Sequence, residues 1–355
     1  MHVHFIAIGG SAMHNLAIAL SKKGYYVSGS DDLIVEPSKS SLAQYGLLPA
    51  KEGWNSENIN QNLDAVILGM HAKLDNPELI KAKDLGLKIY SYPEYIYEQS
   101  KNKTRVVIGG SHGKTTITSM ILHVLNFYKK DFDYLVGAQL EGFDTMVKIT
   151  EESPVIIIEG DEYLASPIDR RPKFHLYKAN IAVISGIAWD HINVFPTFEN
   201  YIAQFETFID TIEPGGTLIY CTEDKVLTNL VEKKAGSNLV KKPYSIPNAK
   251  VENNITTLIT NSGEISLRIF GDHNLLNLNA AKQVCTELGL SEDKFYAAVK
   301  SFTGAARRLE LLGENDSTAV FKDFAHSPSK LKATINAVKN QYPERKLVAV
   351  IELHT

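Results

Sequence analysis

The sequence predicts an α/β protein of more than one domain, built around parallel sheets. Three observations support this fold class. Short apolar runs that end in glycine alternate with stretches of helical periodicity, as in strand–helix–strand units. The chain has 355 residues, 44% of them hydrophobic, which is more than one ordinary core holds. Residues 100–104 are polar and lack apolar periodicity, which indicates a linker between two sets of such units.

The composition argues against several classes of partner. A formal net charge of -4 gives no overall basic surface for nucleic acid or an anionic membrane, so we expect small-molecule partners. The chain has only Cys221 and Cys285, no long apolar run, and no charged N-terminal region followed by a hydrophobic one. We therefore expect a protein of the reducing cytoplasm without a membrane span. The sequence predicts no particular oligomeric state.

A glycine turn follows the first predicted strand. Residues 2–8 are apolar, and helical periodicity covers residues 12–23. The turn between them, Gly9-Gly10-Ser11, suits a bound nucleotide. The dinucleotide fingerprint would have glycines at the positions of Ser11 and His14, so the turn does not fit NAD.

A carboxylate follows the second predicted strand, residues 25–28. Asp31, preceded by Ser30, lies about 20 residues beyond the glycine turn, where a carboxylate can hydrogen-bond a ribose or a base. A turn-forming or helix-capping aspartate is the alternative.

Two more strands are expected before the linker, at residues 65–68 and 87–90. The first leads into a loop that contains His71, a helix begins after Asn76, and a short helix from Pro93 precedes the linker. Alternating strands and helices imply a parallel sheet with ligands at the carboxyl ends of its strands.

A second glycine turn follows the strand predicted at residues 105–109. It reads Gly110-Ser111-His112-Gly113-Lys114-Thr115-Thr116, and helical periodicity continues to residue 128. Backbone N–H groups and a helix N-terminus converge on a phosphate site there, Lys114 adds positive charge, and the Thr115 hydroxyl can reach Mg²⁺. One glycine of the full P-loop pattern is missing. The alternative is an ordinary strand–turn–helix with a solvent-facing lysine.

Acidic residues end the next buried strand. Residues 155–158 are apolar and are followed by Glu159 and two further carboxylates. Hard cations take oxygen ligands, so the pattern predicts a magnesium site beside the phosphate loop. His191 follows the strand predicted at residues 181–185 and is a candidate metal ligand or proton carrier. Exposed loop carboxylates and a structural histidine are the alternatives.

Two polar patterns suggest further ligand contacts. Arg170, Arg171 and Lys173 surround a single proline and could grip an acidic substrate, although a solvated charged loop is the usual alternative. Asn274 and Asn277 lie three residues apart on one face of a predicted helix, so both amides could address one planar ligand edge. Capping of the helix would explain only one of them.

The last part of the chain follows the same alternation. A hinge is expected at residues 304–310, followed by strand 319–322, loop 323–328, helix 329–339 and strand 347–351. One strand–helix–strand unit cannot bury both faces of a sheet. We therefore expect it to pack on its neighbour or to belong to an incomplete domain.

Seven motifs together cover nearly the whole chain. They are Ile8-Gly9-Gly10-Ser11-Ala12-Met13, Ser28-Gly29-Ser30-Asp31, Gly110 to Thr116, Glu159-Gly160-Asp161-Glu162, Asp190-His191, His273-Asn274-x-x-Asn277 and Asp323-Phe324-Ala325-His326-x-Pro328. This set resembles the Mur ligase family, ATP-dependent enzymes that join amino acids or peptides to UDP-N-acetylmuramic acid. The chain looks closest to two branches that act on UDP-N-acetylmuramate: the L-alanine ligase and the muropeptide ligase that recycles the murein tripeptide.

The resemblance implies a three-domain architecture. Residues 1–100 would form a Rossmann-like domain that binds the UDP-sugar, and residues 101–312 a central P-loop ATPase-like domain. Residues 313–355 would begin a C-terminal Rossmann-like ligase domain that is truncated in this chain.

The resemblance also implies roles for individual residues. The UDP-sugar would contact Gly9, Gly10, Ser11, Met13, Ser30, Asp31 and His71. ATP would contact Gly110, Ser111, His112, Gly113, Lys114, Thr115, Thr116, Asn274, Asn277, Arg307, Arg308, Asp323 and His326. Thr115, Glu159 and His191 would bind Mg²⁺, and Lys114, Glu159 and His191 would be catalytic. Arg170, Arg171 and Lys173 would bind the peptide.

The implied reaction is phosphoryl transfer from ATP to the lactyl carboxylate of UDP-N-acetylmuramate, followed by attack of an amine on the acyl phosphate. The segment from Asp169 to Tyr177 is similar to the Asp-x-Arg-x-Lys-Phe-x-x-Tyr pattern of the recycling branch. It favours the tripeptide over L-alanine as the amine, because carboxylates of the peptide could pair with arginine and lysine. L-Alanine stays the alternative.

Two other function classes use the same phosphate loop. A different P-loop enzyme, such as a kinase or a nucleotide-driven switch, would leave the N-terminal domain and the Asn274 and Asn277 pair unexplained. A non-catalytic nucleotide-binding relative would bind UDP-N-acetylmuramate without turning over ATP.

Overall fold

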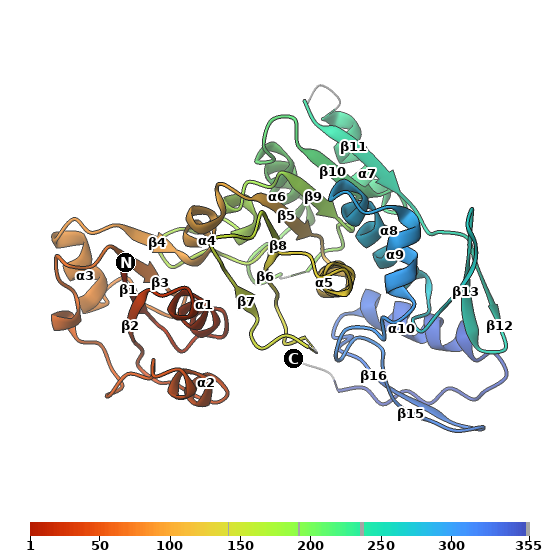
Figure 1. Cartoon of the computed structure of the whole chain (residues 1–355), viewed down its shortest axis with the longest axis horizontal. Coiled ribbons are helices and arrows are strands. Elements are labelled where there is room, and N and C mark those ends of the chain that lie inside the picture. Colours follow the sequence, from red (N-terminus) through yellow and green to blue (C-terminus); the bar gives the residue numbers. More distant parts are fainter. Residues whose placement is uncertain (141, 191, 235–237, 353–355) are drawn as a thin grey trace.

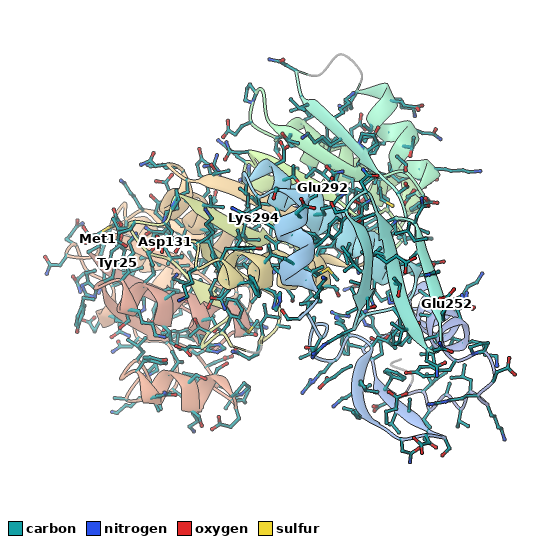
Figure 2. All side chains as sticks on the ribbon, turned by 45° about the vertical axis from the view of Figure 1, so that its right-hand side comes forward. Met1, Tyr25, Asp131, Glu252, Glu292 and Lys294 are labelled. Atoms are coloured by element: carbon teal, nitrogen blue, oxygen red, sulfur yellow. The ribbon has the colours of Figure 1, made fainter. Side chains whose placement is uncertain are left out.

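The computed structural model describes residues 1–140, 142–190, 192–234 and 238–352. In Figure 1 the chain runs from an N-terminal sheet on the left, through a larger central sheet, to a C-terminal part at the lower right. Figure 2 shows the side chains along this length, with Met1 near one end of the molecule and Glu252 near the other. The parallel N-terminal sheet and the mostly parallel central sheet confirm the α/β fold class.

The N-terminal part contains a four-stranded parallel sheet in the order β2-β1-β3-β4. Its strands are β1 (His2–Ile6), β2 (Tyr26–Ser30), β3 (Ala65–Leu68) and β4 (Ile89–Ser91). Its helices are α1 (Ser11–Lys22), α2 (Ser38–Gln44), α3 (Pro77–Asp84) and α4 (Tyr92–Ser100), with the 3-10 turn η1 (Ser56–Asn58). The Asn76 side chain accepts the Glu78 N–H at 2.9 Å, which fixes the start of α3.

The central part is a seven-stranded sheet in the order β11-β10-β9-β5-β8-β6-β7. Its strands are β5 (Thr104–Gly109), β6 (Asp133–Leu135), β7 (Val147–Lys148), β8 (Val155–Glu159), β9 (Ile181–Ile184), β10 (Thr217–Cys221) and β11 (Val240–Tyr244). Every pair is parallel except β6 with β7. The phosphate loop follows the middle strand, β5, so neighbouring strands deliver side chains on both sides of it.

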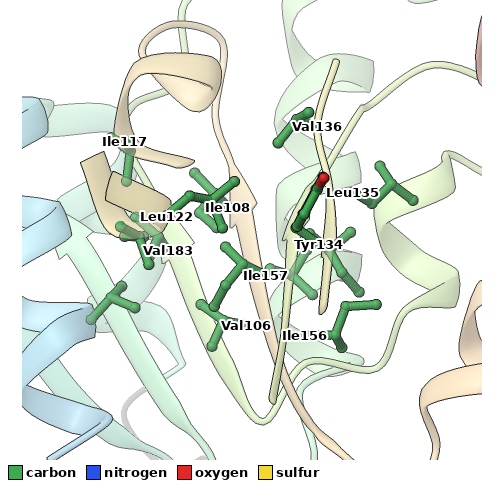
Figure 3. Packing of buried hydrophobic residues seen from close by; sticks show 14 of the residues in the cluster. Val106, Ile108, Ile117, Leu122, Tyr134, Leu135, Val136, Ile156, Ile157 and Val183 are labelled. Carbon is green, nitrogen blue, oxygen red and sulfur yellow. The ribbon is translucent and has the colours of Figure 1, made fainter. Parts of the chain in front are cut away.

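Helices cover the central sheet. They are α5 (Lys114–Phe127), α6 (Phe198–Asp210), α7 (Lys225–Lys233), α8 (Asp272–Glu287) and α9 (Glu292–Val299), with the 3-10 turn η2 (Lys173–Leu176). Figure 3 shows how Val106, Ile108 and Ile157 of β5 and β8 pack with Ile117 of α5 and Val183 of β9. These five side chains are fully buried, because a parallel sheet is covered on both faces.

The last elements form two small antiparallel sheets and one helix. They are β12 (Ala249–Glu252), β13 (Ile255–Thr260), β14 (Gly263–Leu267), β15 (Glu310–Glu314), β16 (Ala319–Lys322) and α10 (Pro328–Gln341). The C-terminal half of α10 packs against α8 of the central part and against β13: Ala337 is buried, and the Thr256 hydroxyl of β13 donates to Gln341 Oε1 at 2.8 Å.

A direct contact links the N-terminal part to the central part. The backbone N–H of Met146, just before β7, donates to the side-chain oxygen of Asn15 on α1 at 3.0 Å. We propose a domain boundary near residue 100, where α4 ends and the next sheet starts. The second expected boundary, after residue 312, falls inside β15, and we propose to place it in the turn before that strand.

One local prediction was wrong. Residues 347–351 form no strand, and Val350 is 96% exposed, because no described strand lies beside this segment to pair with it. The hinge expected at residues 304–310 stays a prediction; its last residue, Glu310, is the first residue of β15. Within the described ranges, no helix has the length and apolar character needed to cross a membrane.

Candidate active site

Two glycines in left-handed conformations shape the phosphate loop between β5 and α5. Gly110 has φ +123° and Gly113 has φ +82°, values that side chains rarely tolerate. A Cβ atom on Gly110 would overlap the Ser185 hydroxyl, and one on Gly113 would overlap the side-chain oxygen of Asn277. The loop can therefore approach β9 and α8 closely only because both positions are glycine.

Lys114, the first residue of α5, is held in place by two acceptors. Its ammonium group donates to Glu162 Oε2 and to the Gly110 carbonyl, each at 2.7 Å. Burial by itself lowers the pKa of Lys114, but the charge of Glu162 outweighs it and the pKa lies above its ordinary value. The lysine is thus a fixed positive charge at the loop. Glu162 also accepts a hydrogen bond from the Tyr201 hydroxyl at 3.2 Å.

Thr115 and Glu159 provide neighbouring oxygen atoms beside this lysine. The Thr115 hydroxyl donates to Glu159 Oε1 at 2.7 Å, and the Gly137 N–H donates to Glu159 Oε2 at 2.8 Å. Oxygen ligands of this kind suit Mg²⁺, which takes one or two protein ligands and fills its shell with water and phosphate oxygens. The described residues include no group of three or more His, Cys, Asp or Glu side chains placed to hold a metal ion. His191 lies outside the described residues, so its role stays a prediction.

The loop opens into a cavity of about 380 Å³ between the central part and the C-terminal elements. The predicted ATP-binding residues that line it are Ser111, His112, Gly113, Lys114, Thr115, Thr116, Asn274, Asn277, Arg308, Asp323 and His326. Gly110 contributes its carbonyl to Lys114 from the edge of the cavity. Arg307 does not line it: its backbone N–H donates to Glu310 and its side chain is exposed. Eleven of the thirteen predicted residues thus line one cavity.

Asn274 and Asn277 of α8 are buried at the cavity wall. Asn274 Nδ2 donates to the Phe270 carbonyl at 3.0 Å, and Asn277 lies against Gly113 of the phosphate loop. Across the cavity, Asp323 accepts from the Leu309 N–H at 3.0 Å, which fixes the loop before α10.

Several cavity residues were not predicted individually. They include Glu162, Ser185, Asp190, His273, Ser329, Lys330 and Thr334. Glu162 stood in the acidic motif and could have been identified as the partner of Lys114. Lys330 carried only a weak pattern, a lysine in the first turn of a helix after the Asp323 to Pro328 motif. The pKa of Lys330 lies below its ordinary value, because burial and the charges of Lys114 and Arg308 outweigh the opposite effect of Asp190.

The predicted UDP-sugar residues come together at the end of β1. The Gly9 N–H donates to Asp31 Oδ2 at 2.7 Å, and a Cβ on Gly10 would lie 3.5 Å from Met13 and 3.7 Å from His71. Burial raises the pKa of Asp31 to about 6. Ser11 is exposed at the start of α1 and stays available to a ligand.

The Ser30 side chain has a structural partner that sequence reasoning missed. Its hydroxyl donates to Glu78 Oε2, in a fully buried cluster that also contains His4. Glu78 also accepts from the Asn55 N–H at 2.8 Å. The Ser30 carbonyl in turn accepts the Ala7 and Ile8 N–H groups, so both oxygens of Ser30 have partners within the protein.

The three cations predicted to bind peptide lie close together after β8: Arg170 and Arg171 precede η2, and Lys173 is its first residue. Arg171 forms a bidentate pair with Asp169, at 2.6 and 2.9 Å, and its side chain is 59% exposed. Arg170 is exposed. Lys173 is paired with Asp161 at 2.6 Å, one residue from the Glu162 that holds Lys114. This charged loop, residues 169–173, thus adjoins the nucleotide cavity through the acidic motif.

Comparisons with known proteins identify the family. The model of the Mur ligase family catalytic domain matches residues 2–104, and the model of the Mur ligase middle domain matches residues 108–285. The chain belongs to the Mur ligase family. Mur ligases use ATP to form amide bonds, and this chain is an ATP-dependent ligase of that family. The resemblance seen in the sequence and the Mur ligase architecture are both confirmed.

Individual relatives belong to two branches. A UDP-N-acetylmuramate–L-alanine ligase of Carboxydothermus hydrogenoformans is 32% identical over 99% of this chain and 76% of that protein. A murein peptide ligase of Psychrobacter arcticus has a similar structure, with a TM-score of 0.77, 25% identity, and coverage of 100% of this chain and 79% of that one. A UDP-N-acetylmuramate–alanine ligase of Thermotoga maritima, with a TM-score of 0.72, 22% identity, and coverage of 97% and 79%, supports the fold alone.

Proposed function

We propose that this enzyme joins the lactyl carboxylate of UDP-N-acetylmuramate to the amine of the murein tripeptide L-alanyl-γ-D-glutamyl-meso-diaminopimelate, at the expense of ATP. The observation that carries the proposal is the cavity in which Lys114, Thr115 and Glu159 lie side by side at the ends of β5 and β8. This arrangement suits a triphosphate on the phosphate loop with its terminal phosphate near the acidic strand end.

The first chemical step would be phosphoryl transfer. A lactyl carboxylate oxygen attacks the γ-phosphorus of ATP, the bond to the bridging oxygen breaks, and ADP leaves with an acyl phosphate formed. Both reactants are anions, so the main task of the protein is positioning and charge neutralisation. Lys114 would stay charged through this step because Glu162 supports its protonated form. Thr115 and Glu159 would hold a magnesium ion, which supplies further neutralisation of the phosphates.

The second step would form the amide bond. The amine attacks the acyl carbon, inorganic phosphate leaves, and the amine loses one proton. Backbone N–H groups of the phosphate loop would retain the departing phosphate.

The UDP-sugar would lie against the N-terminal glycine turn. Gly9 and Gly10 offer backbone close to the diphosphate, and His71 lies beside Gly10. Asp31 would accept hydrogen bonds from the uridine. The hydrogen bond from the Met146 N–H to Asn15 on α1 connects this turn to the central part. The UDP-sugar and ATP would therefore be held at a fixed position relative to each other.

Two observations bear on the amine substrate. The charged loop at residues 169–173 favours the tripeptide, because it offers Arg170 to a carboxylate and keeps Arg171 partly exposed. The Psychrobacter arcticus murein peptide ligase is similar in structure over the whole chain. The 32% identity to an L-alanine ligase favours L-alanine, which is the second candidate.

The test is a phosphate-release assay on the complete protein with ATP, Mg²⁺ and UDP-N-acetylmuramate, offering the tripeptide and L-alanine in parallel. We expect release with the tripeptide, and a higher KM for the tripeptide after Arg170→Ala, with the KM for ATP unchanged. Lys178→Ala, an exposed cation just after η2, is the matched control. Turnover with L-alanine alone would contradict the tripeptide proposal. Release without UDP-N-acetylmuramate or amine would favour a different P-loop enzyme.

A further inference from the structure

The first turn of α10 places a second lysine in the nucleotide cavity. Lys330 lines the cavity together with Lys114 and Arg308, and its side chain is only 17% exposed. Its ammonium group lies 3.3 Å from Asp190 Oδ2 and 3.2 Å from His326 Nε2. The side chain is therefore directed into the cavity rather than into solvent.

The position of this lysine is set by packing at both ends of α10. At the N-terminal end, the Ser329 hydroxyl and His112 Nε2 of the phosphate loop are 2.8 Å apart. At the C-terminal end, Gln341 accepts from Thr256 of β13 at 2.8 Å. Lys330 is thus brought to the phosphate loop by a helix that is anchored on the central part, 216 residues beyond Lys114 in the sequence.

Lys330 and Lys114 have similar surroundings: each is mostly buried and paired with a carboxylate. Lys114 is 16% exposed and paired with Glu162 at 2.7 Å, whereas Lys330 is 17% exposed and paired with Asp190 at the longer distance of 3.3 Å. Three cations, Lys114, Lys330 and Arg308, line the same cavity. Four carboxylates, Glu159, Glu162, Asp190 and Asp323, line it as well, and the two lysines are paired with Glu162 and Asp190. Because the pair of Lys330 is the longer one, a phosphate oxygen of a bound nucleotide can compete with Asp190 for its ammonium group.

We propose that Lys330 is a further phosphate-binding residue, which contacts the β- and γ-phosphates of ATP and thereby joins α10 to the bound nucleotide. This inference rests on the proposed function, because it takes ATP as the ligand of the cavity. An ammonium ion is a point charge without planar geometry, so it can move from the Asp190 carboxylate to a phosphate oxygen by rotation of its flexible stem. Lys330 would contribute to the binding of ATP and little to the binding of AMP, because AMP lacks those two phosphates.

The experiment measures binding of ATP and AMP to the wild-type chain, Lys330→Met, Lys330→Arg and the control Lys332→Met. Lys332 lies on the same helix and is exposed. A charge-assisted hydrogen bond to phosphate implies about tenfold weaker ATP binding for Lys330→Met, with AMP binding unchanged. Lys330→Arg should recover most of the loss, and Lys332→Met should bind both nucleotides as the wild type does.

The alternative is that Lys330 only anchors α10 through its ion pair with Asp190. In that case Lys330→Met would lower the melting temperature and weaken ATP and AMP binding equally, which would overturn the inference. Unchanged ATP binding would also overturn it. If the wild-type chain bound neither ATP nor AMP, and Lys114→Met bound neither as well, the proposed function itself would be overturned. This role of Lys330 would then fall with it.

Discussion

Asp31 provides a prediction in which stability and ligand binding change in opposite directions. The carboxyl is 4% exposed and accepts the Gly9 N–H, and burial raises its pKa from 3.8 to about 6. A raised pKa means that the folded state binds the proton more tightly than the unfolded state does. The carboxyl therefore contributes stability below about pH 4 that is lost as the pH rises through 6.

The size of the effect follows from the shift. A rise of about 2 pKa units corresponds to about 3 kcal/mol at neutral pH, an upper limit because the unfolded state is taken as unperturbed. Asp31→Asn removes the titration and keeps one oxygen for the Gly9 N–H, at the cost of the hydrogen bond that the Asp32 N–H donates to Oδ1 at 3.0 Å. We expect the variant to melt several degrees above the wild type at pH 7.5, and close to it at pH 4.

The assay is thermal melting at the two pH values, combined with UDP-N-acetylmuramate binding at pH 7.5. The variant should bind the UDP-sugar about tenfold more weakly, because a charge-assisted hydrogen bond is lost. Asp84→Asn, which changes an exposed carboxyl at the end of α3, is the control and should change neither property much. If Asp31→Asn were no more stable at pH 7.5, or its advantage persisted at pH 4, the reasoning about burial would be refuted.

Three further predictions concern the loops that hold the substrates. Thr115→Val should abolish the Mg²⁺ dependence of ATP binding, and Thr115→Ser should preserve it; equal behaviour of the two would argue against a metal contact. Gly113→Ala should weaken ATP binding more than tenfold because its Cβ would overlap Asn277, whereas Gly142→Ala, with a similar φ of +80° and open space around it, should not. Asn15→Ala removes the contact with the Met146 N–H and should raise the KM for UDP-N-acetylmuramate several-fold while ATP binding is retained; a parallel loss of ATP binding would indicate misfolding instead.

The parts of the site that the sequence revealed are local in the chain. The residues from Gly110 to Thr116 combine a strand, two glycines and a helix start in one stretch, so their geometry follows from neighbouring residues alone. Glu159 was predictable because it ends a run of four apolar residues that must be a buried strand. The same logic located Asp31 after β2.

The parts that were missed depend on contacts between distant segments. The pairing of Lys114 with Glu162 spans 48 residues, and Lys330 reaches the cavity only because α10 packs on the central part. The sequence predicted that Ser30 contacts a ligand, but its hydroxyl donates to Glu78 of α3 in the folded structure. The apolar residues 347–351 were predicted to form a strand. A strand also needs a neighbouring strand for its backbone hydrogen bonds, and an apolar run in the sequence does not show whether one is present.

The short strands were also beyond sequence reasoning. β6 and β7 have three and two residues, too few for a periodic pattern, and they form the edge of the sheet beside α1. That edge carries the contact between Met146 and Asn15, which places the N-terminal part relative to the central part. The relation between the two predicted substrate sites therefore needed the folded structure.

The central claim, that ATP activates the lactyl carboxylate of the UDP-sugar, is tested most directly by isotope transfer. UDP-N-acetylmuramate labelled with ¹⁸O in its lactyl carboxylate is turned over by the complete protein with ATP, Mg²⁺ and the tripeptide, and the released phosphate is analysed by mass spectrometry. An acyl phosphate intermediate predicts that one ¹⁸O atom moves into phosphate for each amide bond formed. Unlabelled phosphate would mean that water attacks ATP, and the ligase mechanism would be contradicted.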